Sequence, residues 1–167
     1  RCVPLPHQTR DISELYVPVT DRKLARVLST NRMLFFHCLP TDNGANDKQN
    51  VTEARFTVYC LKALQTLYEE RKCALSPADV GIIVPYRNQI AAIRKEMDCQ
   101  GVRGLDNITI DTVERFQGSQ RNIIFYLFTI RHAYQLQFLA ASTYLEKSGD
   151  AVPYWVDRKL NVALTRA

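Results

Sequence analysis

Polar residues that could bind a phosphate directly follow an apolar run at residues 80–84. The segment reads Pro85-Tyr86-Arg87-Asn88-Gln89. The planar guanidinium of Arg87 can hold a phosphate through two parallel hydrogen bonds, and Tyr86 can stack or donate a hydrogen bond. A proline-stopped strand followed by the solvated start of a helix would look the same, and this segment alone favours that simpler interpretation.

A second polar segment, residues 112–121, separates short apolar runs at 108–110 and 123–128. Gly118 allows a close approach of the backbone to a ligand, and the neighbouring amides could hold an anion. The hydroxyl of Thr112 could donate to a backbone phosphate of nucleic acid. A polar turn is the plain alternative, but a turn that joins Phe, Gln and Gly between two buried strands is more specific than that, and it favours a function.

A third group of polar residues lies on the last predicted helix, over residues 156–166. Its apolar residues form a stripe suited to packing on a sheet, namely Leu160, Ala163 and Leu164. Its polar residues include Arg158, Asn161, Thr165 and Arg166. A polar face on a packed helix is usually a solvated surface, so this segment alone also favours the interpretation without a function.

The apolar runs of the sequence predict the elements that would position these segments. Strands are predicted at residues 33–39, 80–84, 108–110 and 123–128, and their continuous apolar character is typical of strands buried on both faces. Helices are predicted at residues 21–28, 51–71, 87–97, 135–140 and 156–166, with loops at 41–48 and in the rest of 131–153. Because strands and helices alternate, we expect one α/β domain over residues 1–167, with a parallel sheet covered by helices on both faces. In such sheets ligands bind at the carboxyl ends of the strands, where the polar segments would meet.

The composition is that of a folded intracellular protein with a mild excess of positive charge. The 167 residues contain 22 Lys and Arg against 17 Asp and Glu, a formal net charge of +5, and 46% hydrophobic residues. The hydrophobic fraction excludes a disordered chain, and the charge weakly favours a polyanionic partner such as nucleic acid. Five scattered cysteines without a CxxC pair argue against a disulfide framework or a zinc site, so no metal site and a cytoplasmic or nuclear location are predicted.

The two ends of the sequence predict a piece of a longer protein. The chain begins at Arg1 without a start methionine or a signal peptide, and it stops at Ala167 inside the last predicted helix. Natural domains seldom end within an amphipathic helix, so truncation at both ends is expected. No apolar run reaches the roughly 20 residues needed to cross a bilayer.

Taken together and in this order, the three polar segments resemble motifs IV, V and VI of superfamily-1 helicases, most closely those of the Upf-like and Dna2-like group. The group's patterns are approximately PYxxQ, TVDxFQGxExDxII and RLNVALTRAR, and this chain has PYRNQ, TVERFQGSQRNII and KLNVALTRA. The segment Asn50-Val51-Thr52-Glu53-Ala54 also resembles the group's N-x-x-E-A helix start. The resemblance covers about residues 33–167, and chance agreement on all three motifs is remote.

The resemblance implies a RecA-like sheet of the P-loop NTPase type, the second of two such domains that close on ATP and Mg²⁺. The first domain would supply the phosphate loop and the magnesium carboxylates, and this one would supply arginine fingers, for which the matching residues are Arg87 and Arg166. Residues matched to the nucleotide are Gly118, Gln120 and Arg158. Residues matched to single-stranded DNA or RNA are Tyr86, Gln89, Thr112, Gln117 and Asn161. Cycles of ATP binding and hydrolysis would move the domains along a strand that is gripped by its sugar-phosphate backbone.

Several positions depart from the group's pattern. Gln120 and Asn122 are amides where the group usually has Glu and Asp, which puts contact with the nucleotide's sugar or metal shell in doubt. Some members carry their γ-phosphate arginine at the position of Ile90, and Arg87 is the candidate to replace it. The sequence contains no GxxxxGK[ST] motif and no Asp-Glu pair after a strand, so the isolated chain is expected to be inactive.

Two other functions stay open from the sequence. A non-enzymatic nucleic-acid-binding or scaffold domain derived from a helicase would fit the two amide substitutions and the modest net charge. A dinucleotide enzyme on a doubly wound sheet would need GxGxxG after a strand, and the sequence has none.

Overall fold

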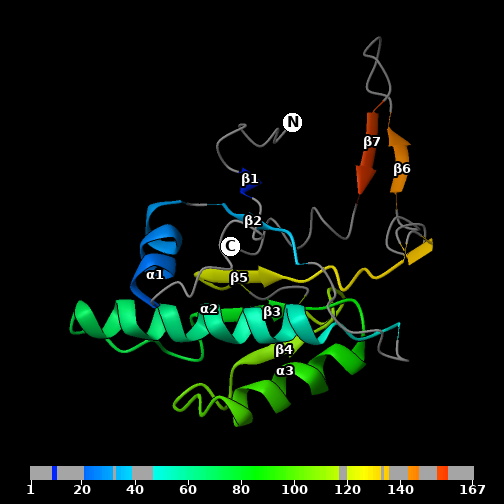
Figure 1. The fold of residues 1–167 in the computed structure, drawn as a ribbon. Helices are drawn as coiled ribbons and strands as arrows, with labels where there is room; N and C mark the ends of the chain where they lie inside the picture. The colour runs from blue at the N-terminus through cyan, green and yellow to red at the C-terminus, as the bar shows by residue number, and fades with distance from the viewer. Residues whose placement is uncertain are drawn as a thin grey trace.

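A computed structural model describes residues 9–10, 21–31, 33–38, 47–116, 120–132, 134–135, 143–146 and 154–157 (Figure 1). The helices are α1 (Asp21–Thr30), α2 (Val51–Glu70) and α3 (Arg87–Cys99). The strands are β1 (Thr9–Arg10), β2 (Phe35–Phe36), β3 (Val80–Ile83), β4 (Thr109–Asp111), β5 (Ile123–Tyr126), β6 (Thr143–Glu146) and β7 (Tyr154–Asp157). No helix in this described part of the chain is both long and apolar enough to cross a membrane.

The central sheet has three parallel strands in the order β4-β3-β5. Strand β3 lies in the middle, and all four of its residues are buried. Ile82 of β3 lies opposite Ile110 of β4 and Phe125 of β5, which places the side chains of these three residues on the same face of the sheet. This alternating pattern gives the sheet one face for the helices and a second, also apolar, face that carries Ile83, Ile124 and Tyr126.

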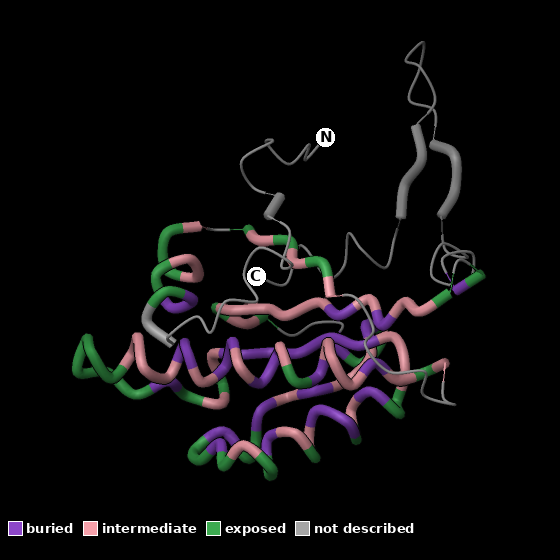
Figure 2. Tube along the Cα trace, in the orientation of Figure 1, coloured by how far each residue is buried: buried purple, intermediate pink, exposed green. Residues whose placement is uncertain are grey.

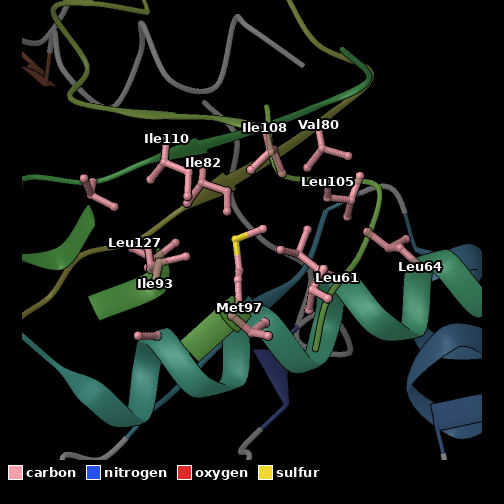
Figure 3. Close-up of a cluster of buried hydrophobic side chains, with 14 of the residues drawn as sticks. Leu61, Leu64, Val80, Ile82, Ile93, Met97, Leu105, Ile108, Ile110 and Leu127 are labelled. Atoms are coloured by element: carbon pink, nitrogen blue, oxygen red, sulfur yellow. The ribbon is translucent and has the colours of Figure 1, made fainter. Parts of the chain in front are cut away.

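Helices α2 and α3 pack side by side on the face that carries Ile82 (Figure 1). Side chains from both helices, from β3 and β4 and from the segments next to β4 and β5 form one apolar cluster, drawn in Figure 3: Leu61, Leu64, Val80, Ile82, Ile93, Met97, Leu105, Ile108, Ile110 and Leu127. Helix α1 packs on α2 through Leu24 and Ala25. The buried stretches of α2, α3 and β3 in Figure 2 contribute most of this cluster.

The opposite face of the sheet is covered by the turn that follows β4. Ile83 forms a buried cluster there with Val113 and Phe116. Gly81 makes this contact possible, because a Cβ at that position would lie 2.7 Å from a ring carbon of Phe116. Among the described residues, the turn with Phe116 packs on this face, and helices α2 and α3 pack on the other.

The predicted α/β class and its parallel sheet are confirmed, together with the helices at 21–28, 51–71 and 87–97 and the strands at 80–84, 108–110 and 123–128. Asn50 explains where α2 begins, because its side-chain oxygen accepts a hydrogen bond from the N–H of Glu53 at 3.0 Å. Helix α3 begins directly after Pro85, which ends the strand before it.

Two predicted elements are wrong in part. The run at 33–39 forms only the two-residue strand β2, and Phe35 is 51% exposed, so it is not a strand buried on both faces. Residues 143–157 were expected to hold a loop and the start of the last helix, but they contain the antiparallel strands β6 and β7, and Val156 and Asp157 belong to β7. The aromatic and β-branched content of this pair favours strands. Residues 136–140 and 158–166 of the predicted helices lie outside the described part.

Candidate functional site

The carboxyl ends of the three parallel strands lie side by side. The N–H of Val84 donates to the carbonyl of Asp111 at 3.0 Å, and the N–H of Leu127 donates to the carbonyl of Ile83 at 2.9 Å. The polar segments that follow β3, β4 and β5 therefore leave the sheet at the same edge. This is the edge at which ligands bind in open α/β sheets.

The start of α3 presents Arg87 at this edge. Tyr86 is the N-cap in an extended conformation, with φ −131° and ψ 138°, and Arg87 is the first helical residue and is exposed. No residue in the described part of the chain pairs with its guanidinium. A helix N-terminus favours anions, so an exposed arginine there has the charge and the hydrogen-bond donors that a phosphate from outside this domain would need.

Gln89, two residues further along α3, lies on the opposite side of the helix and points into the protein. Its side chain is 0% exposed. Its Oε1 accepts a hydrogen bond from the N–H of Asn50 at 2.8 Å, and its Nε2 donates to the carbonyl of Asn50 at 2.9 Å. The predicted contact of Gln89 with nucleic acid conflicts with this burial. Its amide instead fastens the start of α3 to the start of α2.

Glu53 is the centre of the same buried network. Its Oε1 accepts hydrogen bonds from the N–H groups of Phe128 and Thr129, both at 3.1 Å. Its Oε2 accepts from the Thr129 hydroxyl at 2.9 Å and from the Gln89 amide at 3.3 Å. Burial raises the pKa of the Glu53 carboxyl above its ordinary value, although the hydrogen bonds from Thr129 and Phe128 act in the opposite direction. One carboxylate thereby joins α2, α3 and the segment after β5.

Thr129 shows how strongly this network constrains the backbone. It is fully buried and has φ 50°, a left-handed conformation that β-branched residues rarely adopt. The three hydrogen bonds to Glu53 from residues 128 and 129 stabilise this conformation. Such strain is typical of functional sites. The N-x-x-E-A pattern in the sequence was the signal for Glu53, but the pattern alone gave the carboxylate no role.

The segment 131–135 is fixed to the turn before α2. Gln135 is buried, its Oε1 accepts from the N–H groups of Arg131 and His132 at 2.7 and 2.9 Å, and its Nε2 donates to the carbonyl of Asp47 at 2.6 Å. The Asp47 carboxylate bonds to the side chains of His132 and Tyr134. The hydrogen bond from Tyr134 is the main reason that the pKa of Asp47 lies below its usual value.

Thr112 leaves β4 at the same edge and is half-buried. Its N–H donates to the Asp111 carboxylate at 2.8 Å, and its carbonyl accepts from Arg115 and Phe116 at 3.1 and 3.2 Å. The structure thus brings Tyr86, Arg87 and Thr112 to one edge of the sheet. The hydrogen-bonded network of Glu53, Gln89 and Asn50 at this edge was not predicted from the sequence.

Gln120 lies at the opposite, amino edge of the sheet. The N–H of Ile123 donates to the carbonyl of Asp79 at 2.9 Å, so the residues just before β5 lie beside those just before β3. The Asn122 amide donates to the Asp79 carboxylate at 2.7 Å, and an open pocket is lined by Ala78, Gln120, Arg121 and Asn122. Within the described residues, Gln120 is therefore not brought together with Arg87 and Thr112. Gln117, Gly118, Arg158, Asn161 and Arg166 lie outside the described part of the chain.

Comparison with known proteins matches this chain to a family of ATPase domains. The family model described as AAA domain matches residues 18–167. The DNA replication ATP-dependent helicase/nuclease DNA2 of Mus musculus is 31% identical over 162 residues, which are 92% of this chain and 13% of that protein. The DNA2 protein of Homo sapiens is 31% identical over 118 residues, 71% of this chain and 9% of that protein. The protein of Danio rerio named as helicase mov-10-B.2 is 28% identical over 146 residues, 80% of this chain and 13% of that protein. The chain thus spans only about a tenth of the length of these relatives.

Proposed function

The chain belongs to the AAA-domain family of superfamily-1 helicases, in the Upf-like group with Dna2 and MOV-10. From this premise we propose that it is the second RecA-like domain of an ATP-dependent helicase or translocase. In this proposal it supplies arginine fingers and nucleic-acid contacts to an ATP site. The phosphate loop and the magnesium ligands of that site belong to a preceding RecA-like domain of the same protein. The isolated chain is therefore expected not to hydrolyse ATP.

The observation that carries this proposal is the placement of Arg87. Its guanidinium is exposed at the carboxyl edge, while the helix that presents it is fixed by the buried bonds of Gln89 to Asn50 and Glu53. A positively charged group on a rigid support stabilises charge that develops on a transferred phosphoryl group without reorganisation during the reaction. Arg87 thus has the donor set that the γ-phosphate of ATP requires.

The remaining predicted contacts complete the proposal. Arg166 would be a second arginine finger, and Gly118 and Arg158 would contact the nucleotide, whereas Gln120 lies at the opposite edge of the sheet and is left out of this site. Tyr86 and Thr112, which lie at the same edge as Arg87, would contact single-stranded DNA or RNA together with Gln117 and Asn161. Bound ATP supplies the γ-phosphate and Mg²⁺ neutralises part of its charge. This chain's own residues orient that phosphate and grip the strand.

The test compares the isolated chain with the full-length protein that contains it. ATP hydrolysis is measured for each, with and without a single-stranded oligonucleotide. The proposal predicts no hydrolysis by the isolated chain and hydrolysis stimulated by nucleic acid in the full-length protein. Absence of a phosphate loop in the preceding sequence, or of any hydrolysis by the full-length protein, would contradict it.

A non-enzymatic nucleic-acid-binding or scaffold role is the second candidate. The observation in its favour is that Gln120 and Asn122 replace two carboxylates of the group's motif V pattern. In the fold, however, the Asn122 amide bonds to Asp79, so this substitution has a local structural use. An oligonucleotide bound by a full-length protein that does not hydrolyse ATP would favour this second role.

A further inference from the structure

His132 and Tyr134 form a pair of exposed, nearly parallel rings after β5. Their centroids are 5.7 Å apart and the angle between the ring planes is 9°. The His132 side chain is 54% exposed and Tyr134 is 57% exposed. The two rings stack on each other, and each residue stays more than half exposed, so part of the ring surface is accessible to a ligand.

The pair is held in place by a single carboxylate from another part of the chain. Asp47 Oδ1 lies 3.1 Å from His132 Nε2, and Asp47 Oδ2 accepts a hydrogen bond from the Tyr134 hydroxyl. The backbone beneath the rings is fixed by buried Gln135, which bonds to the N–H of His132 and to the carbonyl of Asp47. Both rings are therefore oriented before any ligand arrives, which reduces the entropy lost on binding.

The rings lie near Tyr86, which the proposed function assigns to nucleic acid, and near basic residues. Tyr86, at the start of α3, is close enough to Tyr134 to contribute to the rise in the pKa of the Tyr134 phenol, although the hydrogen bond to Asp47 is the main cause. Lys48 and Arg131 are the sequence neighbours of Asp47 and His132. Arg131 also donates to the carbonyl of Gln49 at 3.2 Å, so its charge is kept beside the rings.

We propose that His132 and Tyr134 form a stacking platform for a base of single-stranded nucleic acid. This inference rests on the proposed function and adds to it a contact outside motifs IV, V and VI. Every base has a π face, so a ring platform binds bases of any sequence, as a translocating motor requires. The basic side chains of Lys48 and Arg131 bind the adjoining phosphates.

The test uses three variants of the full-length protein and a fluorescent single-stranded oligonucleotide. Tyr134→Leu removes the ring, Tyr134→Phe keeps the ring and removes the hydroxyl that bonds to Asp47, and Lys95→Ala removes one exposed charge on α3. The dissociation constant is measured by fluorescence anisotropy without nucleotide. Loss of one stacked base predicts about a tenfold weaker affinity for Tyr134→Leu. Tyr134→Phe and Lys95→Ala are expected to stay within about twofold of the wild type, since neither removes a stacking surface.

The platform is contradicted if Tyr134→Leu binds as tightly as the wild type, or if Tyr134→Phe loses as much affinity as Tyr134→Leu. Photocrosslinking of an oligonucleotide that carries 5-iodouracil gives a second readout, with a crosslink expected at Tyr134 or His132 and crosslinks only elsewhere contradicting the platform. If the wild type hydrolyses ATP in response to nucleic acid while Tyr134→Leu is unaffected in binding, only the platform fails. If the wild type neither binds nucleic acid nor hydrolyses ATP, the proposed function fails as well. A Tyr134→Leu variant that keeps its oligonucleotide affinity but loses binding to a protein would assign the rings to a protein partner and overturn the proposal.

Discussion

At the carboxyl edge of the sheet, three segments far apart in the sequence meet around the partly buried Glu53 carboxylate. At the amino edge, polar side chains form hydrogen bonds with each other near the surface. The Asn122 amide donates to the Asp79 carboxylate, and Arg121 donates to the Thr109 hydroxyl at 3.2 Å. The first arrangement buries its polar groups and leaves Arg87 exposed above them. The second uses its polar groups to close the ends of the strands. Polar content alone therefore does not distinguish the two edges, whereas the hydrogen-bonded network of Glu53 beside the exposed Arg87 does.

The largest effect on stability is expected from removing the centre of that frame. Glu53→Ala leaves two backbone N–H groups and a hydroxyl without their acceptor, and the free energy of unfolding should fall by roughly 3 kcal/mol. Chemical denaturation measures this change. The matched control is Glu69→Ala, which removes an exposed carboxylate from the same helix and should change stability by less than about 0.5 kcal/mol. Equal effects of the two variants would show that the hydrogen bonds to Glu53 do not stabilise the carboxyl edge.

A smaller loss is expected where the sheet packs against Phe116. Gly81→Ala places a Cβ 2.7 Å from a ring carbon of Phe116 and 3.0 Å from Ile124 Cδ1, so overpacking should cost about 1–3 kcal/mol. Thermal unfolding of the single variant and of the double variant with Phe116→Leu checks this cause. The smaller Leu side chain should make the Gly81→Ala substitution less costly, and an unchanged cost would show that Phe116 is not the obstacle.

At the amino edge, Asn122→Asp is expected to cost about 1 kcal/mol or less. The change restores the residue usual in the group but sets a second carboxylate against Asp79, and the site is exposed enough for salt to screen the repulsion. Denaturation at low and high salt should show a cost that shrinks with salt and disappears in the double variant with Asp79→Asn. A large loss of ATP hydrolysis in Asn122→Asp would instead place this edge in the nucleotide site.

The pH dependence of stability tests whether the Glu53 carboxyl at the carboxyl edge is desolvated. Because burial raises the pKa of Glu53 in the folded state, the native protein binds a proton more readily than the unfolded chain. The stability contributed by this group should therefore fall as the pH rises from the ordinary glutamate pKa of 4.5 through the raised folded value. The Glu53→Gln variant should lack this decline. Parallel curves for the wild type and Glu53→Gln would show that the carboxyl is not desolvated.

The sequence predicted the parts of the fold that depend on local patterns. Helix α2 and strand β3 follow directly from apolar spacing and from the Asn50 cap and Pro85. The role of Gln89 could not be predicted, because its partners Asn50 and Glu53 lie more than 30 residues away and only the packing of α2 against α3 brings them together. Thr129 gave no signal either, since its left-handed conformation depends on a distant carboxylate and not on its own type.

The candidate site divides in the same way. Motif spacing placed Tyr86, Arg87 and Thr112 at one edge, because each follows a strand and the carboxyl ends of parallel strands lie at the same edge of a sheet. Gln120 lies at the other edge because it directly precedes β5, and residues just before a parallel strand lie at the amino end of the sheet. The match to the helicase motif alone did not take this direction into account. The strands β6 and β7 were missed because their alternation is short and resembles a polar loop.

The most direct test of the proposed ATP site is ATP hydrolysis by the full-length protein at saturating nucleic acid, with Arg87→Ala and Arg166→Ala beside Lys95→Ala. Lys95 is an exposed cation on the same helix as Arg87, so it controls for the loss of one positive charge. We predict that kcat falls by about 10³-fold for each arginine variant, the size expected of an arginine finger, and stays near the wild-type value for Lys95→Ala. Hydrolysis that is equally fast in all four proteins would contradict the claim that this domain completes an ATP site.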